Sequence, residues 1–325
     1  MGNQYLSSRH PVIQLLFFAL ITLISVLAVM LLSIITGIVL FRVPLTDWMN
    51  LLDVTDPANV PLLKFLQITQ SLSMFVIPPI IFGWFVVRDP WLYLNINKSP
   101  DRKQVTVVLV LAVLILPVLN LLSVLNQELR LPGVLSGIED WMKSTEAQAG
   151  DLTEAFLTVS TFSGYLVNVL MVVLIPAFGE EFFFRGVLQK IFHRWFRNPH
   201  FAIIFVAIIF SVFHMQFYGF LPRFVLGVLF GYLFYWSGNI WYPVLAHMIN
   251  NFLPVTLTYF FRNQFDPAEL DKIGTGPEAW IWALPALVLS VAAVLFFYQN
   301  CKILNSLETP NTNHGGTENT EFHED

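Results

Sequence analysis

The chain has 325 residues, of which 56% are hydrophobic and only 12% are charged, and its net charge is −5. Its mean hydropathy is +0.66. A soluble domain carries about 25% charged residues, so this composition excludes an ordinary soluble protein, and the negative charge argues against a nucleic-acid partner. The single cysteine, Cys301, excludes an intrachain disulfide and a cysteine-rich metal site. We therefore predict an all-α, polytopic membrane protein.

Eight apolar runs approach or exceed the length needed to cross a bilayer, which is about 20 helical residues. They cover residues 12–41, 60–87, 104–125, 156–178, 201–217, 222–238, 241–261 and 279–300. The fifth and sixth are short, so the sequence predicts about eight transmembrane helices, with seven or nine left open. The fourth has an alternative end, because the helix can continue past Glu180 to Phe196 with a kink near Pro176.

The runs divide the chain into four parts. Residues 1–154 hold the first three helices and a loop predicted to be extracytoplasmic, which includes a short interfacial helix anchored by Trp141. Residues 155–261 form the candidate catalytic core, and residues 262–304 hold the last loop and helix. Residues 305–325 are a polar tail that we expect to be disordered.

The charges of the connecting segments predict the orientation in the membrane. Basic residues follow the second and fourth runs: Arg88, Lys98, Arg102 and Lys103, then Arg185, Lys190, Arg194 and Arg197. The connections after the first, third and seventh runs are acidic on balance. Since Lys and Arg favour the cytoplasmic side, both termini are predicted to lie in the cytoplasm, with the plasma membrane as the expected location.

Two adjacent carboxylates, Glu180 and Glu181, follow the apolar run Val169–Phe178. A charge inside the bilayer costs about 2.5–3.5 kcal/mol on the insertion scale, so it usually has a partner or a function. Neighbouring helical residues point about 100° apart, so the two carboxylates cannot share one role. Glu181 and Arg185 are four residues apart and are predicted to pair, which leaves Glu180 as the functional carboxylate. Alternatively, these charges only mark a helix end at the membrane surface.

Three further polar residues fall inside apolar runs. His214 ends one run, and His247 and Asn251 lie four apart on one helical face. Each alone is more easily explained as a hydrogen-bonding contact between helices, which is worth about 0.6 kcal/mol. Together with Glu180 they indicate an aqueous site within the membrane.

The spacing of the chain supports their convergence. Asn198-Pro199 breaks the helix, and an antiparallel return places Glu180 and His214 at a similar depth, about 22–27 Å from this turn. The depth of His247 matches less well, and a cavity facing the cytoplasm would reconcile it. Gly227 and Gly231 are predicted to let the sixth helix pack closely, as small residues do in membrane helices.

These side chains suit general-base hydrolysis. Glu180 could take a proton from a water held by His214, while His247 and Asn251 could donate to the oxyanion of a tetrahedral intermediate. Zinc held by Glu180, His214 and His247 is the alternative. The absence of His-Glu-x-x-His excludes a zincin. From the residues alone, the metal-free and the zinc-bound routes both stay open.

Three motifs carry a family resemblance. Glu-Glu-x-x-x-Arg begins at Glu180, Phe-x-x-x-His ends at His214, and His-x-x-x-Asn begins at His247. In this order, each in a membrane helix, they resemble the CAAX protease and bacteriocin-processing (CPBP, or Abi) family, which includes the type II CAAX prenyl endopeptidases. The family core would cover roughly residues 155–261. The remaining helices agree with the family only in being membrane helices.

The resemblance implies an intramembrane endopeptidase whose site opens to the cytoplasm and whose substrate is a membrane-associated peptide or protein, such as a CAAX tail. Members of this family have been described both as metalloproteases and as glutamate proteases that need no metal. An amide is a poor zinc ligand, so the pairing of His247 with Asn251 favours the second, and we expect that no cofactor is required. Four residues match its catalytic positions and two match supporting positions: Glu180, His214, His247 and Asn251, then Glu181 and Arg185. The rival hypothesis is a non-catalytic immunity or scaffold protein, or a small transporter that uses Glu180 to carry protons.

Overall fold

The computed structural model describes residues 6–42, 56–129, 131–261 and 279–308. Within these residues the chain is helical and contains no strand, which confirms the all-α prediction. Seven helical stretches here are long and apolar enough to cross a membrane: Pro11–Phe41, Val60–Val87, Arg102–Gln127, Phe162–Phe196, Phe217–Ser237, Trp241–Phe261 and Ala279–Lys302. An eighth apolar helix, α11, has only 15 residues, or about 22 Å, which is shorter than a hydrocarbon core of about 30 Å.

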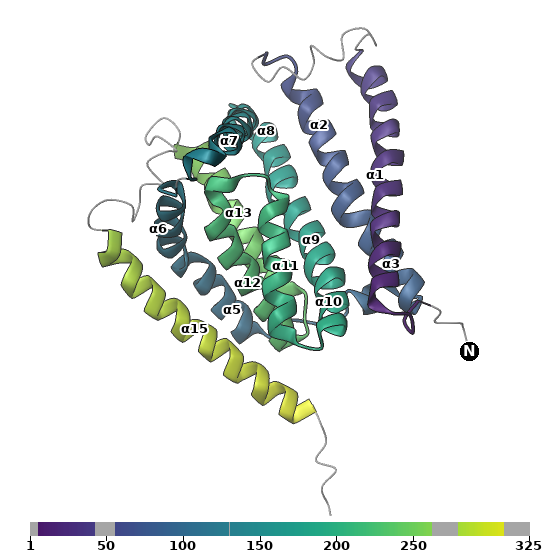
Figure 1. Ribbon diagram of the computed structural model, residues 1–325, viewed down its shortest axis with the longest axis vertical. Helices are drawn as coiled ribbons and strands as arrows, with labels where there is room; N and C mark the ends of the chain where they lie inside the picture. The colour runs from purple at the N-terminus through teal and green to yellow at the C-terminus, as the bar shows by residue number, and fades with distance from the viewer. Residues whose placement is uncertain (1–5, 43–55, 130, 262–278, 309–325) are drawn as a thin grey trace, which may run out of the picture.

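The first two spans form an antiparallel pair at one edge of the molecule (Figure 1). A π-helical turn at Leu72–Val76 joins α2 to α3, and the short α4 follows. The next span consists of two helices, α5 and α6, which meet just before Pro117. The bounds are α1 (Pro11–Phe41), α2 (Val60–Ser71), α3 (Ile77–Val87), α4 (Pro90–Tyr93), α5 (Arg102–Leu114) and α6 (Leu116–Gln127).

The fourth span is one continuous helical path from Phe162 to Phe196, which confirms the longer of the two predicted ends. Pro176 lies at the start of α9, where it interrupts the hydrogen-bond ladder because it lacks an N–H. The path contains two π-helical segments, which in proteins often occur at functional sites. Its parts are α8 (Phe162–Asn168), π-helical Val169–Leu174, α9 (Ile175–Glu181), π-helical Phe182–Leu188 and α10 (Gln189–Phe196).

Helices α11 (Pro199–Phe213) and α12 (Phe220–Ser237) form a tightly packed hairpin. A Cβ atom on Gly227 would lie 3.0 Å from the Cβ of Ala207, and one on Gly231 would lie 2.8 Å from Cγ2 of Ile203. No larger residue fits at either position without movement, so the predicted close packing at these glycines is confirmed. Helix α13 (Trp241–Phe261) and helix α15 (Ala279–Glu308) complete the described bundle.

The bundle has two ends, which we call the terminal face and the α7 face. At the terminal face, Arg194 near the end of α10 donates a hydrogen bond to Gln14 at the start of α1. Gln104 at the start of α5 contacts Cys301 near the end of α15. Both termini of the described chain therefore lie at this face (Figure 1).

The α7 face is named after helix α7 (Ser136–Leu157), which lies across the opposite end of the bundle. Asn126 at the end of α6 donates to the carbonyl of Phe217, and the ring of Trp141 on α7 lies 5.2 Å from that of Phe217. The predicted short interfacial helix at Trp141 is thus a helix of 22 residues. Helix α15 also continues through residues 305–308, where we predicted disorder, and the rest of the predicted tail lies outside the described residues.

Candidate active site

The two adjacent glutamates face different surroundings, as their helical positions require. Glu181 is fully buried and its Oε1 accepts a hydrogen bond from Arg185 at 2.8 Å, so the predicted pair is present. The same Oε1 lies 2.9 Å from Nδ1 of His247. Arg185 also donates to the carbonyl of Gly227. Glu181 and Arg185 therefore tie α9 to both α12 and α13.

Glu180 points instead toward two imidazoles. Its Oε2 lies 3.9 Å from Nε2 of His214 and 3.9 Å from Nε2 of His247. This distance is too long for a hydrogen bond. Among the residues that the structure describes, no side chain or backbone group bonds to this buried oxygen. The predicted convergence of Glu180, His214 and His247 from three helices is therefore confirmed, and the carboxylate is left available to a further group.

In both imidazoles Nδ1 already makes a hydrogen bond to a protein group, and this fixes the hydrogen-bonding role left to Nε2, the atom that faces Glu180. Nδ1 of His214 lies 2.8 Å from the carbonyl oxygen of Phe210, which can only accept, so Nδ1 must donate. In neutral His214, the Nε2 atom that faces Glu180 is then an acceptor. Nδ1 of His247 likewise donates to the carboxylate of Glu181.

Asn251 joins the site through the first π-helical segment. Its Nδ2 donates to the carbonyl of Val172 at 3.0 Å, and its Oδ1 accepts from Asn250 at 3.3 Å. These two bonds orient the amide and use only one of its two N–H groups. Asn251 and His247 both line the cavity described next, so the second N–H is available there.

A cavity of about 450 Å³ contains all four predicted catalytic residues. Its walls come from helices α2, α7, α9, α11, α12 and α13 and from the first π-helical segment of the fourth span. Glu180 lies about 24 Å from Phe196 and about 27 Å from Phe162 along the helical path, so the site is near the middle of the bundle. It is large enough to hold several residues of an extended peptide.

His247 reaches this depth because the turn that precedes α13 is recessed into the bundle. Ile240 is fully buried, and the segment before α5 covers the turn. Asn95 donates to the carbonyl of Gly238, and the indole N–H of Trp241 donates to the carbonyl of Ile96. Helix α13 therefore begins below the surface of the bundle. Although His247 is only six residues from Trp241, it reaches the depth of Glu180, so the mismatch in depth between these two residues that the sequence suggested is not present.

Sequence reasoning missed several cavity residues. Arg223 lines the cavity and donates to the main chain and the side chain of Gln216. Asn250 and part of α7 also contribute to the lining. Arg223 had a visible signal, because it is a lone cation in an apolar run, which is the criterion that selected Glu180. The contribution of α7 had none, since it depends on how the connection folds over the bundle.

Comparisons with known proteins give one family match and one curated relative. A family model described as type II CAAX prenyl endopeptidase Rce1-like matches residues 162–253, which include the carboxylate pair, both histidines and Asn251. Among curated proteins, the Uncharacterized protein YpbD of Bacillus subtilis (strain 168) is 29% identical over 109 residues, 32% of this chain and 50% of that protein. This chain therefore matches only half the length of that relative. No solved structure matches the chain.

The family match covers the helices that carry all three motifs, so it confirms the resemblance drawn from the motifs alone. Residues 162–253 match the model of the type II CAAX prenyl endopeptidase Rce1-like family, and the chain is similar to that family over this region.

Proposed function

We propose that this protein is an intramembrane endopeptidase that hydrolyses peptide bonds of a membrane-associated peptide or protein, either a CAAX-type tail or a related substrate. One observation carries the proposal. An unpartnered carboxylate oxygen of Glu180 lies 3.9 Å from imidazole nitrogens of two other helices, inside a cavity large enough for a peptide. The family of residues 162–253 supports the same class of reaction.

The hydrogen-bond inventory suggests how a water would be oriented. Glu180 Oε2 and Nε2 of neutral His214 both accept, so one water between them donates both of its hydrogens. Its remaining lone pairs then point away from both groups, toward a substrate carbonyl carbon. Glu180 takes the proton as that oxygen attacks, and the proton later passes to the leaving amine.

His247 and Asn251 are proposed to stabilise the oxyanion. Asn251 has one N–H left for this role after its bond to Val172. Because Nδ1 of His247 already donates to Glu181, donation from Nε2 requires the imidazolium form. Removing one such donor from an oxyanion hole typically costs about 10²–10³ in kcat.

Zinc is the alternative way to activate the water. Glu180, His214 and His247 are suitable ligand types. The hydrogen bonds that Nδ1 of His214 donates to Phe210 and Nδ1 of His247 donates to Glu181 are the support that metal-bound histidines usually have. Ligands of tetrahedral zinc lie about 3.3–3.6 Å apart, so the 3.9 Å separations would have to shorten. A bound zinc would supply Lewis-acid activation of water. We propose the metal-free form, and retained cleavage after chelation and removal of metal would support it.

The decisive test replaces Glu180 by Gln. Purified protein in lipid is screened against a broad peptide library, and Glu180→Gln is expected to lower cleavage about 10²–10⁴-fold without lowering the thermal midpoint. Glu154→Gln is the matched control, because Glu154 is exposed on α7 and outside this cavity. Equal activity of Glu180→Gln and wild type would exclude the proposed mechanism. A pH-dependent flux lost in Glu180→Gln, without any cleavage, would favour a transporter.

A further inference from the structure

The catalytic cavity is closed toward the terminal face. Beyond Glu180, the chain continues through Phe182, Phe183 and Phe184 into a core in which the side chains are almost completely buried. This core also includes Val187 and Ile191 of the same span, and Val206, Phe234 and Val244 from the three neighbouring helices α11, α12 and α13. A packed interior of this kind has no voids large enough for a peptide. A substrate therefore cannot reach Glu180 from the face that holds both termini.

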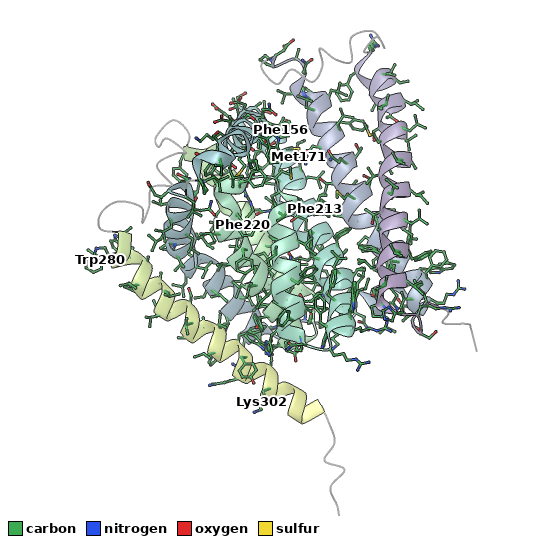
Figure 2. All side chains as sticks on the ribbon, in the orientation of Figure 1. Phe156, Met171, Phe213, Phe220, Trp280 and Lys302 are labelled. Carbon is green, nitrogen blue, oxygen red and sulfur yellow. The ribbon has the colours of Figure 1, made fainter. Side chains whose placement is uncertain are left out.

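The cavity extends instead toward the α7 face. On the fourth span its lining residues, from Met171 to Glu180, all precede the phenylalanine core. On α13 they begin at His247 and continue toward the end of the helix at the α7 face. Helix α7 itself supplies the outer wall, including the exposed Thr153. Figure 2 shows Phe156 of α7 close to Met171, at the end of the bundle away from Lys302.

The charges identify which side of the membrane each face occupies. At the terminal face, the ends of α1, α3, α5, α10, α11 and, as far as Lys302, α15 and their connections carry two acidic residues, Asp89 and Asp101, against eight basic ones: Arg9, Arg88, Lys98, Arg102, Lys103, Arg194, Arg197 and Lys302. The described residues at the α7 face include Arg42 and Lys143 against a larger acidic group: Asp56, Glu128, Glu139, Asp140, Glu146, Asp151 and Glu154. All these connections are short enough for the positive-inside rule to apply. The terminal face is therefore the cytoplasmic one.

Two expectations from the sequence now conflict. The charges place both termini in the cytoplasm, whereas the family resemblance implied a site that opens to the cytoplasm. In this structure the site opens at the face opposite the termini, so only one of the two can hold. The charge asymmetry is read from this chain itself, whereas the cytoplasmic opening was carried over from the family. We therefore keep the orientation that the charges give.

We infer that the catalytic cavity opens to the extracytoplasmic side of the membrane, beneath α7. The orientation itself does not depend on the activity, but the substrate class that follows from it rests on the proposed peptidase function. The substrate is a polypeptide segment that lies outside the cytoplasm, such as a secreted peptide or the external end of a membrane protein. Of the two substrate classes proposed above, the inference selects the related substrate, because a CAAX-type tail that is presented only in the cytoplasm would not reach Glu180.

Accessibility of single cysteines tests the orientation without relying on activity. In a Cys301→Ala background, Thr153→Cys reports on the cavity wall and Ser99→Cys is the matched control at the terminal face, where Ser99 is exposed. Right-side-out and inside-out membrane vesicles are treated with a sulfonated, membrane-impermeant maleimide. We expect labelling of Thr153→Cys only in right-side-out vesicles and of Ser99→Cys only in inside-out vesicles. The reverse pattern, or labelling of both positions in either type of vesicle, would overturn the inference.

A second measurement separates this inference from the proposed function. A water-soluble peptide identified in the library screen is added outside sealed right-side-out vesicles, where we expect cleavage by wild type and none by Glu180→Gln. Cleavage that occurs only with inside-out vesicles would overturn the orientation while leaving the peptidase function intact. Absence of cleavage in both, together with the expected labelling pattern, would overturn the peptidase function and leave the orientation standing.

Discussion

Replacing Arg185 by Met is expected to be one of the most destabilising single changes in this protein. The guanidinium is almost completely buried and donates to Glu181 at 2.8 Å and to the carbonyl of Gly227 at 2.9 Å. It also lies 4.8 Å from the ring centre of Phe210 and 5.3 Å from that of Phe230. Met fills a similar volume but leaves the Glu181 charge buried without its cation. Removing one partner of a buried pair costs about 3–5 kcal/mol.

A matched surface pair and a double variant make this reasoning testable. Lys143 and Glu139 also form an i,i+4 ion pair, with a similar N–O distance of 2.7 Å, but Lys143 is half exposed. Lys143→Met should therefore lower the free energy of unfolding by only about 0.3–0.5 kcal/mol. Removing both buried charges in Glu181→Gln/Arg185→Met should be less costly than Arg185→Met alone, because no charge is left unpaired. The free energy of unfolding in lipid is the measurement. A loss below about 1 kcal/mol for Arg185→Met, or a double variant less stable than the single one, would refute the argument.

Two further predictions concern packing and the oxyanion. Gly231→Ala places a Cβ 2.8 Å from Ile203 and is expected to destabilise by about 1–3 kcal/mol through overpacking. Gly150→Ala in α7 meets nothing within 4 Å and should stabilise by up to about 1 kcal/mol through helix propensity; thermal unfolding of the two variants checks the difference. Asn251→Ala should lower kcat about 10²–10³-fold with little change in KM, whereas unchanged kcat would exclude its role at the oxyanion.

Local rules predicted much of the candidate site. The i,i+4 spacing of Glu181 and Arg185 was enough to predict their pair, because that contact lies within one helix. The near-equal distances of Glu180 and His214 from the Asn198-Pro199 turn predicted their meeting, because an antiparallel hairpin converts equal sequence distance into equal depth. These predictions succeeded where geometry depends on one helix or one turn.

Contacts that depend on the packing of distant segments were not predictable in this way. The recess of the turn before α13 follows from bonds made by Asn95 and Trp241 to segments over a hundred residues away in the chain. The position of α7 over the cavity depends on contacts such as that of Trp141 with Phe217. No periodicity in either segment carries this information, because it arises from tertiary packing. The direction in which the site opens was therefore visible only in the structure.

The adjacent carboxylates show how one helical turn can serve both stability and chemistry. Glu181 faces the packed side, where Arg185 and His247 compensate its charge. Glu180, one residue earlier, faces the cavity. Its buried Oε2 has no hydrogen-bond partner among the described residues, and neither has Oε2 of Glu181. A buried polar atom without a partner costs about 1–3 kcal/mol, and a charged one costs more. The two glutamates differ in that Glu180, unlike Glu181, lines the cavity, where a water or a substrate can reach it. Glu180→Gln should therefore raise the thermal midpoint while it removes cleavage, the opposite of the stability loss expected for a structural glutamate.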